Sequence, residues 1–378
     1  MRDDFQEMLE MSWEALLSDA VSSVEELAEY IPVIENEKEV LSDICQYHPL
    51  RISKYYLSLI DSNDTDDPIK RLAVPQAHES YLEGSYDTSG ERSNTVLPGL
   101  QHKYEQTALI LATNECAMYC RHCFRKRLVG LNTAEVLQDI GPAAEYIEKH
   151  KEITNVLVTG GDPFVLTNDR IDEILGALTE IRHLDFIRLG TRVPVTFPER
   201  IISDDEFLDM LKKYSSDKKP LYVVTQFNHP REITKRSVRA CDKLRKIGIT
   251  ISNQTVLLKG VNNDSEIMAQ LQRGLVHIGV IPYYVFQCRP VRRVKKHFQI
   301  PLYNACRIIQ ETRRKLDGHS KRFRFIMSHP TGKVEILGMY NGQFFFKYHQ
   351  AKNPNKVGVV FSRLADKTSA WLDDLEEA

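Results

Sequence analysis

The sequence predicts an α/β fold, a partial (β/α)6 barrel with an N-terminal helical region and a small β-rich C-terminal extension. Two observations lead to this prediction. Six apolar runs rich in β-branched residues alternate with six segments of helical periodicity, which is the pattern of parallel strands joined by crossover helices. Six units are too few to close an eight-fold barrel, so we expect the sheet to remain open.

The strands and helices of this barrel follow one another with short connections. The predicted strands are apolar runs at residues 107–112, 155–159, 186–190, 221–226, 250–257 and 282–287. The predicted helices, with apolar residues at helical spacing, are at residues 134–150, 169–181, 204–214, 231–247, 265–278 and 302–316. Active sites of such folds lie at the C-terminal ends of the strands, so polar residues that follow the strands are the first candidates for a site.

Three regions of the chain are predicted from these patterns. Residues 1–97 form an N-terminal helical region, in which residues 24–31 have helical spacing and Ser22 or Ser23 is a suitable cap. Within it, residues 62–68 and 84–94 have the composition of turns and polar loops. Residues 98–322 form the partial barrel. Residues 323–378 form the extension, with short strands at 334–337, 344–348 and 357–361 and a terminal helix.

Composition and charge argue against several classes of function. The 378 residues are 42% hydrophobic, which allows a proper core, and the net charge of −2 argues against a nucleic-acid-binding surface. Residues 1–7 are acidic and lack the apolar core of a signal peptide, and no apolar stretch approaches the length of a membrane span. Seven cysteines, an odd number, without a secretory signal predict a reducing, cytoplasmic location.

Three cysteines, Cys116, Cys120 and Cys123, follow directly after the apolar run at residues 108–112. A buried strand that ends in a short cysteine-rich loop lets three thiolates converge on one metal centre. Structural zinc needs four ligands; no second cysteine pair is present, and His122, between two of the cysteines, would strain the loop as the fourth. We therefore expect a four-iron cluster with one iron open. The alternative, three unrelated buried cysteines, is disfavoured because buried thiols usually occur singly.

Gly160-Gly161-Asp162 follows the second predicted strand. Two glycines let the backbone approach a ligand closely, and the aspartate can accept a hydrogen bond from an ammonium group. By itself the motif is a weak signal, since a plain glycine turn has the same composition. Its place one strand after the cysteine loop favours a ligand site.

Arg125 and Lys333 are further candidates. Arg125 lies two residues beyond Cys123, which brings its guanidinium, a bidentate partner for carboxylates, close to the cysteine loop; the alternative is a solvated basic loop. Lys333 follows Gly332 on a turn before an apolar strand, where an exposed lysine is the common case. A function for Lys333 requires a carbonyl cofactor, to which its amine would bind as a Schiff base.

The C-x3-C-x2-C spacing resembles the signature of the radical S-adenosylmethionine (SAM) enzymes, and Gly160-Gly161-Asp162 resembles the motif with which they hold the amino group of SAM. Over most of its length the chain resembles the lysine 2,3-aminomutase family, radical SAM enzymes that also use pyridoxal phosphate (PLP). No single shared segment would suffice, but together they are specific. They are residues 55–61, 98–100, 116–123, 227–230, 253–258 and 282–284.

The resemblance implies roles for the site residues. The three cysteines bind the four-iron cluster, Arg125 holds the substrate carboxylate, and Lys333 bonds to PLP. His122 is a further cofactor-binding candidate because it flanks the third cysteine, and Gln254 lies in the pocket for SAM and PLP.

The phosphate site of the family is only partly present. Lys103 matches a basic residue near the PLP phosphate, whereas a second basic position of that segment is Thr107 here. The phosphate site must therefore be partly rebuilt. The zinc-binding cysteines at the C terminus of some family members are also absent, since no cysteine follows Cys306, and we expect no zinc.

Two further departures concern the substrate. Lysine-specific members carry carboxylates that pair with the far ammonium of lysine, and the matching positions here are Arg289 and, if a short deletion is allowed, Ser328. An arginine would repel that ammonium at a cost of several kcal/mol in a desolvated pocket. The inversion of charge predicts an anionic side chain and resembles the glutamate 2,3-aminomutases. The alternative is that Arg289 turns outward into the basic run at residues 292–296.

The reaction that the resemblance implies moves the α-amino group of an amino acid to its β-carbon. One electron cleaves SAM, the radical takes a hydrogen from the β-carbon, and the hydrogen returns after the nitrogen has migrated. The expected partners are a small amino acid, an electron donor such as a flavodoxin or ferredoxin, and further copies of the chain. The alternatives are action on L-lysine or on a protein-bound lysine, and a non-catalytic iron–sulfur electron-transfer protein.

Overall fold

The computed structural model describes residues 11–377. Residues 1–7, on which the prediction about a signal peptide rests, lie outside that part. Across residues 11–377, seven parallel strands form the centre of one sheet. They are β3 (Thr107–Thr113), β4 (Asn155–Gly160), β5 (Phe186–Gly190), β6 (Leu221–Thr225), β7 (Thr250–Leu257), β8 (Ile281–Gln287) and β9 (Arg324–His329). The first six confirm the predicted strands, and the seventh was missed. The sheet is open, because β3 and β9 do not pair with each other.

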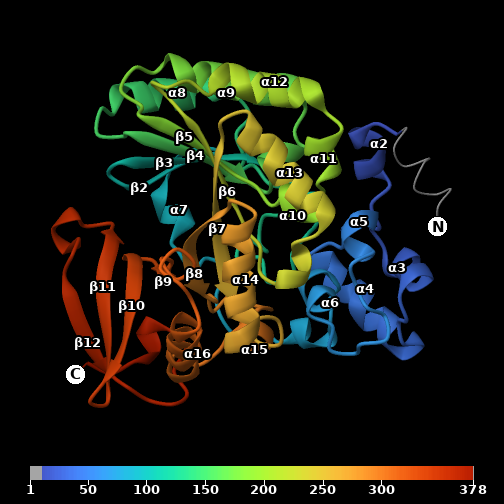
Figure 1. Cartoon of the computed structure of the whole chain (residues 1–378), viewed down its shortest axis with the longest axis vertical. Coiled ribbons are helices and arrows are strands. Elements are labelled where there is room, and N and C mark those ends of the chain that lie inside the picture. Colours follow the sequence, from blue (N-terminus) through green and yellow to red (C-terminus); the bar gives the residue numbers. More distant parts are fainter. Residues whose placement is uncertain (1–10, 378) are drawn as a thin grey trace.

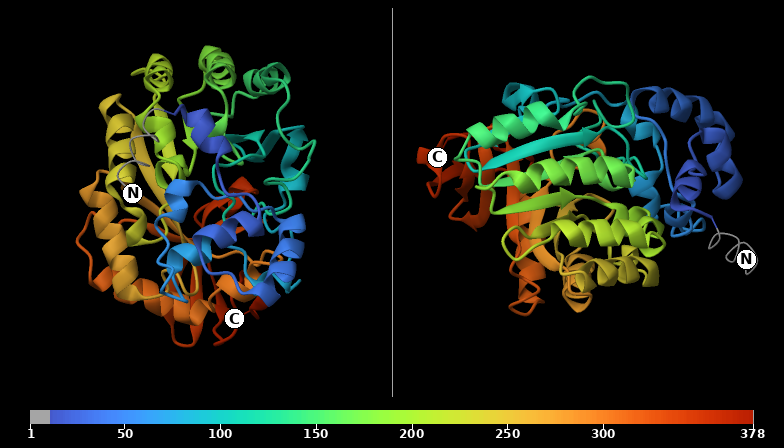
Figure 2. Two further views of the ribbon diagram at one scale, coloured as in Figure 1. Left: turned by 90° about the vertical axis from the view of Figure 1, so that its right-hand side faces the viewer. Right: turned by 90° about the horizontal axis from the view of Figure 1, so that it is seen from above.

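Helices between successive parallel strands cover the outer face of the sheet (Figures 1 and 2). They are α8 (Ile140–Lys149), α9 (Asn168–Glu180), α12 (Asp205–Tyr214), α13 (Lys235–Lys246), α14 (Ser265–His277) and α16 (Leu302–Arg314), with the shorter α10 (Val193–Thr196), α11 (Glu199–Ile202) and α15 (Lys295–Phe298). Two predicted starts were too early. Asp139 caps α8, so residues 134–139 are not helical, and Thr234 caps α13 after a separate turn at Pro230–Glu232.

Antiparallel strands extend the sheet at both edges. β1 (Thr95–Leu97) and β2 (Leu100–Tyr104) lead into β3, while β10 (Gly332–Tyr340), β11 (Gln343–Ala351) and β12 (Val360–Leu364) follow β9. Lys333 is therefore inside β10 and not on the turn before it. Because β9 pairs with both β8 and β10, the domain boundary at residue 322 stays a prediction.

The end of the chain differs from its prediction. The third strand of the extension lies at Val360–Leu364 and not at 357–361. The predicted terminal helix is wrong for the part that the structure describes, where only a 3-10 turn forms at Leu372–Asp374. Asp373 and Asp374 are charged, so a longer helix here would have no apolar face that could be buried. Only the capped turn therefore forms.

The N-terminal helices cover one end of the barrel, and the C-terminal strands lie at the opposite end (Figure 2). These helices are α2 (Trp13–Ser18), α3 (Val24–Tyr30), α4 (Lys38–Tyr47), α5 (Lys54–Leu57) and α6 (Pro68–Ala73), and a short helix α7 (Glu91–Asn94) ends the segment predicted as a polar loop. Ser23 caps α3 as predicted, in a capping box with Glu26. The Tyr55 hydroxyl lies 2.6 Å from Thr234 Oγ1, which joins α5 to the cap of α13.

Residues of the parallel strands alternate between a packed face and a lumen. In β5, Ile187 and Leu189 are buried, whereas Arg188 and Gly190 are half-buried and line the cavity inside the barrel. The same alternation brings Gln254 and Val256 of β7 to the lumen. Side chains on alternate positions of several strands therefore share one interior space.

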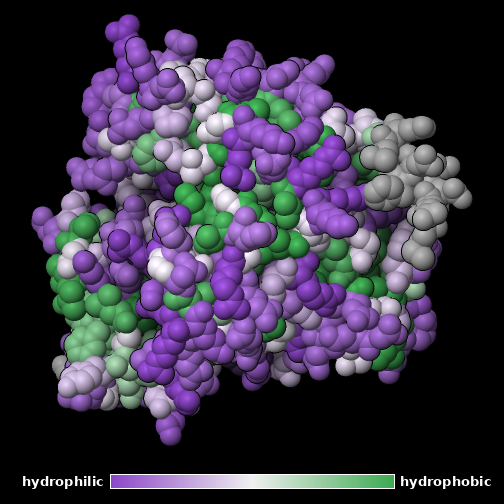
Figure 3. Space-filling model, viewed as in Figure 1, coloured by the Kyte–Doolittle hydropathy of each residue, from purple (hydrophilic) through white to green (hydrophobic). Residues whose placement is uncertain are grey.

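The surface carries apolar side chains over the C-terminal strands (Figure 3). They are Leu337, Tyr340, Val357, Val359, Val360 and Leu364. In the part of the chain that the structure describes, we find no helix with the length and apolarity needed to cross a bilayer.

A fully buried ionic group fixes the cysteine loop against the N-terminal region. Glu79 accepts from Arg121 Nε and Nη2, each at 2.8 Å, and from the ammonium of Lys126. All three side chains are at most 1% exposed. Burial alone would raise the pKa of Glu79, but the charges of Arg121 and Lys126 hold it at about 2. Two cations that flank the cysteines thus depend on one carboxylate.

Replacing Glu79 with glutamine should destabilise the cofactor-free chain by about 3–5 kcal/mol, because Arg121 and Lys126 would stay buried without a counter-ion. The urea midpoint of unfolding measures the effect. Glu83→Gln, at an exposed position a few residues away, is the matched control and should leave the midpoint unchanged. Equal midpoints for the two variants would show that the ionic group does not support the fold.

Candidate functional site

A cavity of about 340 Å³ lies inside the barrel, and every site residue predicted from the sequence lines it. These residues come from segments that are far apart in the chain. They are Lys103, Cys116, Cys120, His122, Cys123, Arg125, Gly160, Gly161, Asp162, Gln254, Arg289, Ser328 and Lys333. The fold therefore brings together the cysteine loop, the glycine motif and the C-terminal lysine in one space.

The three predicted cluster cysteines are half-buried thiols on the loop after β3. Among residues 11–377, no three His, Cys, Asp or Glu side chains are grouped so that they could hold a metal ion. The cysteines instead border a shared cavity, which suits a cluster in which each thiolate binds its own iron. Burial raises the pKa of Cys116 and raises that of Cys123 to about 11, so both thiolates need a nearby positive centre.

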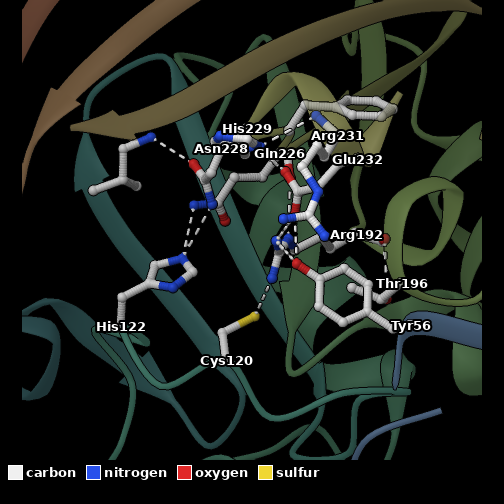
Figure 4. A network of polar contacts seen from close by, with 12 residues as sticks. Tyr56, Cys120, His122, Arg192, Thr196, Gln226, Asn228, His229, Arg231 and Glu232 are labelled. Atoms are coloured by element: carbon white, nitrogen blue, oxygen red, sulfur yellow. Dashed lines mark hydrogen bonds and ion pairs between the residues drawn. The ribbon is translucent and has the colours of Figure 1, made fainter. Parts of the chain in front are cut away.

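Arg192 supplies a positive charge beside Cys120 (Figure 4). Its Nη1 donates to Cys120 Sγ at 2.7 Å, and its Nε donates to the Gln226 carbonyl at 3.0 Å. The backbone N–H of Arg192 donates to Asp162 Oδ2 at 2.6 Å. The segment after β5 is thereby joined both to the cysteine loop and to the glycine motif.

A buried carboxylate holds Arg192 in this position. Glu232 accepts from Arg192 Nη2, and the Tyr56 hydroxyl donates to Glu232 Oε1 at 2.6 Å (Figure 4). The other carboxylate oxygen accepts from the backbone N–H groups of Asn228 and His229, at 2.5 and 3.0 Å. Glu232 therefore links helix α5 and the loop after β6 to the arginine that contacts Cys120.

His122 is neutral in this environment. Burial, with the nearby charges of Arg192 and Lys126, holds its pKa well below the ordinary value. Its Nε2 lies 3.2 Å from Gln226 Nε2 and 3.3 Å from Asn228 Nδ2, which assigns Nε2 as the acceptor and Nδ1 as the protonated atom. Nδ1 is buried without a hydrogen-bond partner, so it is a donor available to a ligand.

The glycines of the Gly160-Gly161-Asp162 motif allow a close backbone contact with the cysteine loop. A Cβ atom on Gly160 would lie 2.3 Å from the Thr113 carbonyl oxygen, and one on Gly161 would lie 2.1 Å from the Glu115 carbonyl oxygen. The motif packs on the backbone just before the cysteines, to which Gly161 and Asp162 donate N–H hydrogen bonds of 2.5 and 2.7 Å. The absence of a Cβ atom at both positions permits this close contact with the cysteine loop.

Asp162 already has hydrogen-bond donors. Its Oδ1 accepts from the Phe164 N–H at 3.1 Å, and its Oδ2 accepts from the Arg192 N–H. Burial nevertheless raises the pKa of this carboxyl above its ordinary value. Its proposed contact with an ammonium group would add to these hydrogen bonds.

Arg125 is buried and points into the cavity, not toward solvent as the alternative reading of the basic loop required. Its Nε donates to Glu91 Oε1 at 2.9 Å, and its Nη1 donates to the Gly160 carbonyl at 3.1 Å. Glu91 also pairs with Arg127 at 3.3 Å. The carboxylate on α7 thus orients the predicted substrate arginine toward the glycine motif.

Arg289 also points into the cavity, which rejects the alternative that it joins the outward basic run. Its Nη2 donates to Ser328 Oγ at 2.9 Å, whereas its Nη1 is buried without a partner. The guanidinium stacks 4.0 Å from the centre of the Phe124 ring, and that of Arg125 lies 4.7 Å from the same ring. Two guanidinium groups therefore lie around one aromatic side chain.

Lys333 is a half-buried amine at the cavity wall, cross-strand from Ser328. Its Nζ lies 5.1 Å from the centre of the Tyr284 ring and 5.8 Å from that of Tyr104. Burial lowers the pKa of Lys333 to about 7, together with repulsion from Arg188, Arg289 and Lys103. The amine is therefore available in its neutral, nucleophilic form near neutral pH.

Three functional candidates in the cavity were not predicted from the sequence: Glu91, Arg188 and Arg192. Arg192 lies just after strand β5, where polar residues are candidates for a site, but nothing in the sequence distinguishes it from the others. Arg188 had a usable signal, since a lone arginine within an apolar strand covered by helices must face the barrel interior. Glu91 had none, because it lies in a polar segment and gains its partners through the fold.

The comparisons place the chain in a class that agrees with this geometry. Residues 110–271 match the family model of the Radical SAM superfamily. An open parallel barrel whose first parallel strand leads into a three-cysteine loop is thus the core of a radical SAM enzyme.

Relatives narrow the class to a family. The chain is 40% identical over 328 residues to the glutamate 2,3-aminomutase of Clostridioides difficile, covering 86% of this chain and 76% of that protein. It is 36% identical to the L-lysine 2,3-aminomutase of Clostridium subterminale, with 87% and 78% covered, and 37% identical to that of Acetoanaerobium sticklandii, with 91% and 81% covered. The chain belongs to the lysine 2,3-aminomutase family of radical SAM enzymes. It is an isomerase, which rejects the alternative of a non-catalytic electron-transfer protein.

The cavity fits the cofactors of this family, which are a four-iron–four-sulfur cluster, SAM and PLP. Three thiols suit three irons of a cluster, and the amine of Lys333 suits the aldehyde of PLP. The unpartnered nitrogen atoms of Arg289 and His122 are donors that the chain itself leaves unused.

Covalent trapping of Lys333 with PLP and borohydride should increase as the pH rises through about 7. The amine must be neutral to attack the aldehyde, and its folded-state pKa is about 7, below the ordinary lysine value of about 10.4. Mass spectrometry of the Lys333 peptide gives the rate at each pH. The peptide that carries the exposed Lys367 is the reference for non-specific labelling. If the labelling rate reached half its maximum only above about pH 9, the amine would not be buried in a cationic site.

Proposed function

We propose that the chain is a 2,3-aminomutase that acts on a free acidic amino acid such as glutamate. The observation that carries this proposal is the guanidinium of Arg289, which points into the cavity with its Nη1 buried and unpartnered. The proposal agrees with the charge inversion in the sequence. Relatives of this chain are named for glutamate or for L-lysine, and the proposal favours glutamate.

The electrostatics of the cavity support an anionic side chain. Arg289 forms no ion pair among the described residues, and its hydrogen-bond partner Ser328 is neutral. Burial lowers the pKa of Arg289 to about 10 although the charge of Glu91 opposes this shift, so its charge is only partly compensated. A substrate carboxylate would stabilise the charged guanidinium through charge-assisted hydrogen bonds. Ser328 directs Nη2, which leaves Nη1 to donate to the substrate.

The alternative substrate is L-lysine, which two of the three relatives carry in their names. Its far ammonium needs a carboxylate in the cavity. In the described part of the chain, the carboxylates that line the cavity are Glu91 and Asp162. Glu91 already pairs with Arg125 and Arg127, and Asp162 accepts from backbone N–H groups. The cavity therefore favours glutamate over lysine.

We assign the two ends of the substrate to two arginines. Arg125, held by Glu91 and beside the glycine motif, would bind the α-carboxylate, and Arg289 would bind the side-chain carboxylate. Both guanidinium groups contact the Phe124 ring, so a short dicarboxylate can reach both. Binding at two ends fixes the β-carbon relative to the cysteine loop, which is the positioning that a hydrogen transfer requires.

The other residues have supporting roles. Cys116, Cys120 and Cys123 would hold the cluster, and the loop at residues 160–162 with Gln254 would bind SAM. Lys333 would hold PLP until the substrate amine replaces it. When bound, the cluster with SAM supplies a hydrogen-abstracting radical, and PLP supplies a carbonyl for the migrating amino group. The N-terminal helices, joined to the site through Tyr56 and Glu232, would limit the access of water.

The remaining predictions concern partners. A one-electron donor such as a flavodoxin or ferredoxin is required by the proposed chemistry. Self-association of the chain stays a prediction, and the apolar side chains over β10–β12 are a surface at which it could be examined.

Anaerobically reconstituted enzyme, supplied with SAM, PLP and a reductant, should convert glutamate to β-glutamate faster than it converts lysine to β-lysine. The panel should include other free amino acids and a lysine-containing peptide, which represents a protein-bound substrate. Chromatographic separation of the α- and β-amino acids, followed by mass spectrometry, identifies the product and thereby the substrate. Faster turnover of free lysine by the unaltered enzyme would reject the acidic-substrate proposal.

Arg289→Asp should lower kcat/KM for glutamate by at least about 100-fold, because the substrate carboxylate would meet a like charge in a desolvated pocket. The same variant should gain measurable turnover of lysine, whose ammonium the new carboxylate can bind. Lys296→Asp makes the same change of charge at an exposed position of the nearby basic run and is the matched control. An unchanged preference in Arg289→Asp would show that Arg289 does not contact the substrate.

A further inference from the structure

We infer that Arg192 raises the reduction potential of the iron–sulfur cluster through its hydrogen bond to Cys120, and that Glu232 is the positioning residue that holds Arg192 there. The inference rests on the proposed function only in the binding of the cluster by Cys116, Cys120 and Cys123, and it does not depend on the substrate. It gives a function to a buried network that no pattern in the sequence indicated.

The first argument is the contact of Arg192 with a cluster ligand. Its Nη1 donates to Cys120 Sγ at 2.7 Å, and within residues 11–377 we find no other hydrogen bond from a charged side chain to a sulfur of the cysteine loop. A guanidinium keeps its proton in proteins, so the contact places a full positive charge beside this thiolate. Hydrogen bonds to the cysteine sulfurs and nearby charge are among the factors that set the potential of a cluster.

The second argument is that Arg192 cannot turn away from the cysteine loop. Its Nε donates to the Gln226 carbonyl at 3.0 Å, and its Nη2 donates to Glu232 (Figure 4). Its backbone N–H donates to Asp162 Oδ2 at 2.6 Å. Both the backbone and the far end of the side chain are therefore fixed, and the remaining nitrogen, Nη1, is directed at Cys120.

The third argument is that Glu232 serves Arg192 and not a ligand. Its side chain is fully buried and does not line the cavity. Tyr56 donates to one carboxylate oxygen at 2.6 Å, and the backbone N–H groups of Asn228 and His229 donate to the other. Burial, together with the charge of Glu232, holds the pKa of Tyr56 well above its ordinary value, so its hydroxyl remains a donor. The single charged partner of this carboxylate among the described residues is Arg192.

The consequence concerns the one electron that starts the reaction. The external donor loses this electron and the cluster gains it; no bond forms or breaks, and Arg192 keeps its proton. The electron adds negative charge to a group that already carries three thiolates, and the guanidinium at Cys120 stabilises that charge. Glu232 opposes the effect from a greater distance, because Arg192 lies between it and the sulfur. Loss of each charge should therefore shift the potential in opposite directions.

The test measures the midpoint potential of the reconstituted full chain in a redox titration followed by electron paramagnetic resonance, without SAM and without an amino acid. Arg192→Gln should lower the potential. A shift of about tenfold in the reduction equilibrium corresponds to about 59 mV for one electron. Glu232→Gln should raise the potential, because its amide oxygen can still accept from Arg192 while the opposing negative charge is lost.

Two further variants make the result specific. Arg236→Gln removes one partner of a different ion pair, with Glu199 at 2.7 Å, and neither residue lines the cavity, so the potential should stay unchanged. If Arg192→Gln does not fold because Glu232 stays buried without a counter-ion, the double variant Arg192→Gln/Glu232→Gln removes both charges. It should also lower the potential, since Arg192 is the nearer of the two charges to the sulfur. An unchanged potential in the double variant would overturn the inference.

The other outcomes are equally decisive. A fall of the potential in both single variants would show that the network only maintains the shape of the cysteine loop. An unchanged potential in Arg192→Gln, with weaker binding of SAM in a separate titration, would show that Arg192 is a SAM ligand instead. Either result overturns the inference. Because no amino acid is present, both are independent of the acidic-substrate proposal. If the unaltered chain takes up no iron, the assignment of the three cysteines fails, and this inference fails with it.

Discussion

The positive charge inside the barrel is the constraint on which the account of this site depends. Within the described residues, six lysine and arginine side chains line the cavity, but only two carboxylates do, and both carboxylates are already engaged. Buried charge of one sign is tolerated only where opposite charge is supplied. Most of the groups that we place here bring negative charge, namely a thiolate-bound cluster, the phosphate of PLP and the carboxylates of the substrate, whereas SAM brings a sulfonium and an ammonium group together with a carboxylate. The chain therefore contributes cations in excess, and its ligands neutralise them.

Parts of the chain far from the barrel strands hold this arrangement in place. Glu79 fixes Arg121 and Lys126 of the cysteine loop, Glu91 orients Arg125, and Glu232 with Tyr56 holds Arg192 beside Cys120. Glu91 and Glu232 contact arginines that line the cavity, Glu79 contacts two residues of the cysteine loop, and all three carboxylates lie outside the strands. The N-terminal region and the loops are thus parts of the active site, which explains why the likeness to the aminomutases extends over most of the chain.

Local patterns in the sequence were sufficient for the barrel and for the identity of its site residues. Strand β7 and the start of α14 lie where periodicity predicts them, because apolar spacing and a cap at Asp264 act locally. β9 was missed because its apolar run is limited to residues 325–327, with Arg324 before it and polar residues after it, and its pairing with β8 makes it a strand. The partners of Arg125 and Arg192, and the contact of Arg188 with Asn155, depend on strands and loops distant in sequence. No pattern within one segment could predict them.

Transfer of deuterium is the most direct test that one cavity holds the radical chemistry and an acidic substrate together. Reconstituted enzyme would be incubated with SAM and with glutamate deuterated at the β-carbon, in parallel with similarly labelled lysine, and the recovered SAM and deoxyadenosine would be examined by mass spectrometry. We expect deuterium in the deoxyadenosyl carbon from glutamate, because the two arginines place that β-carbon next to the cysteine loop. Label from lysine alone, or SAM cleavage without label from either amino acid, would contradict it.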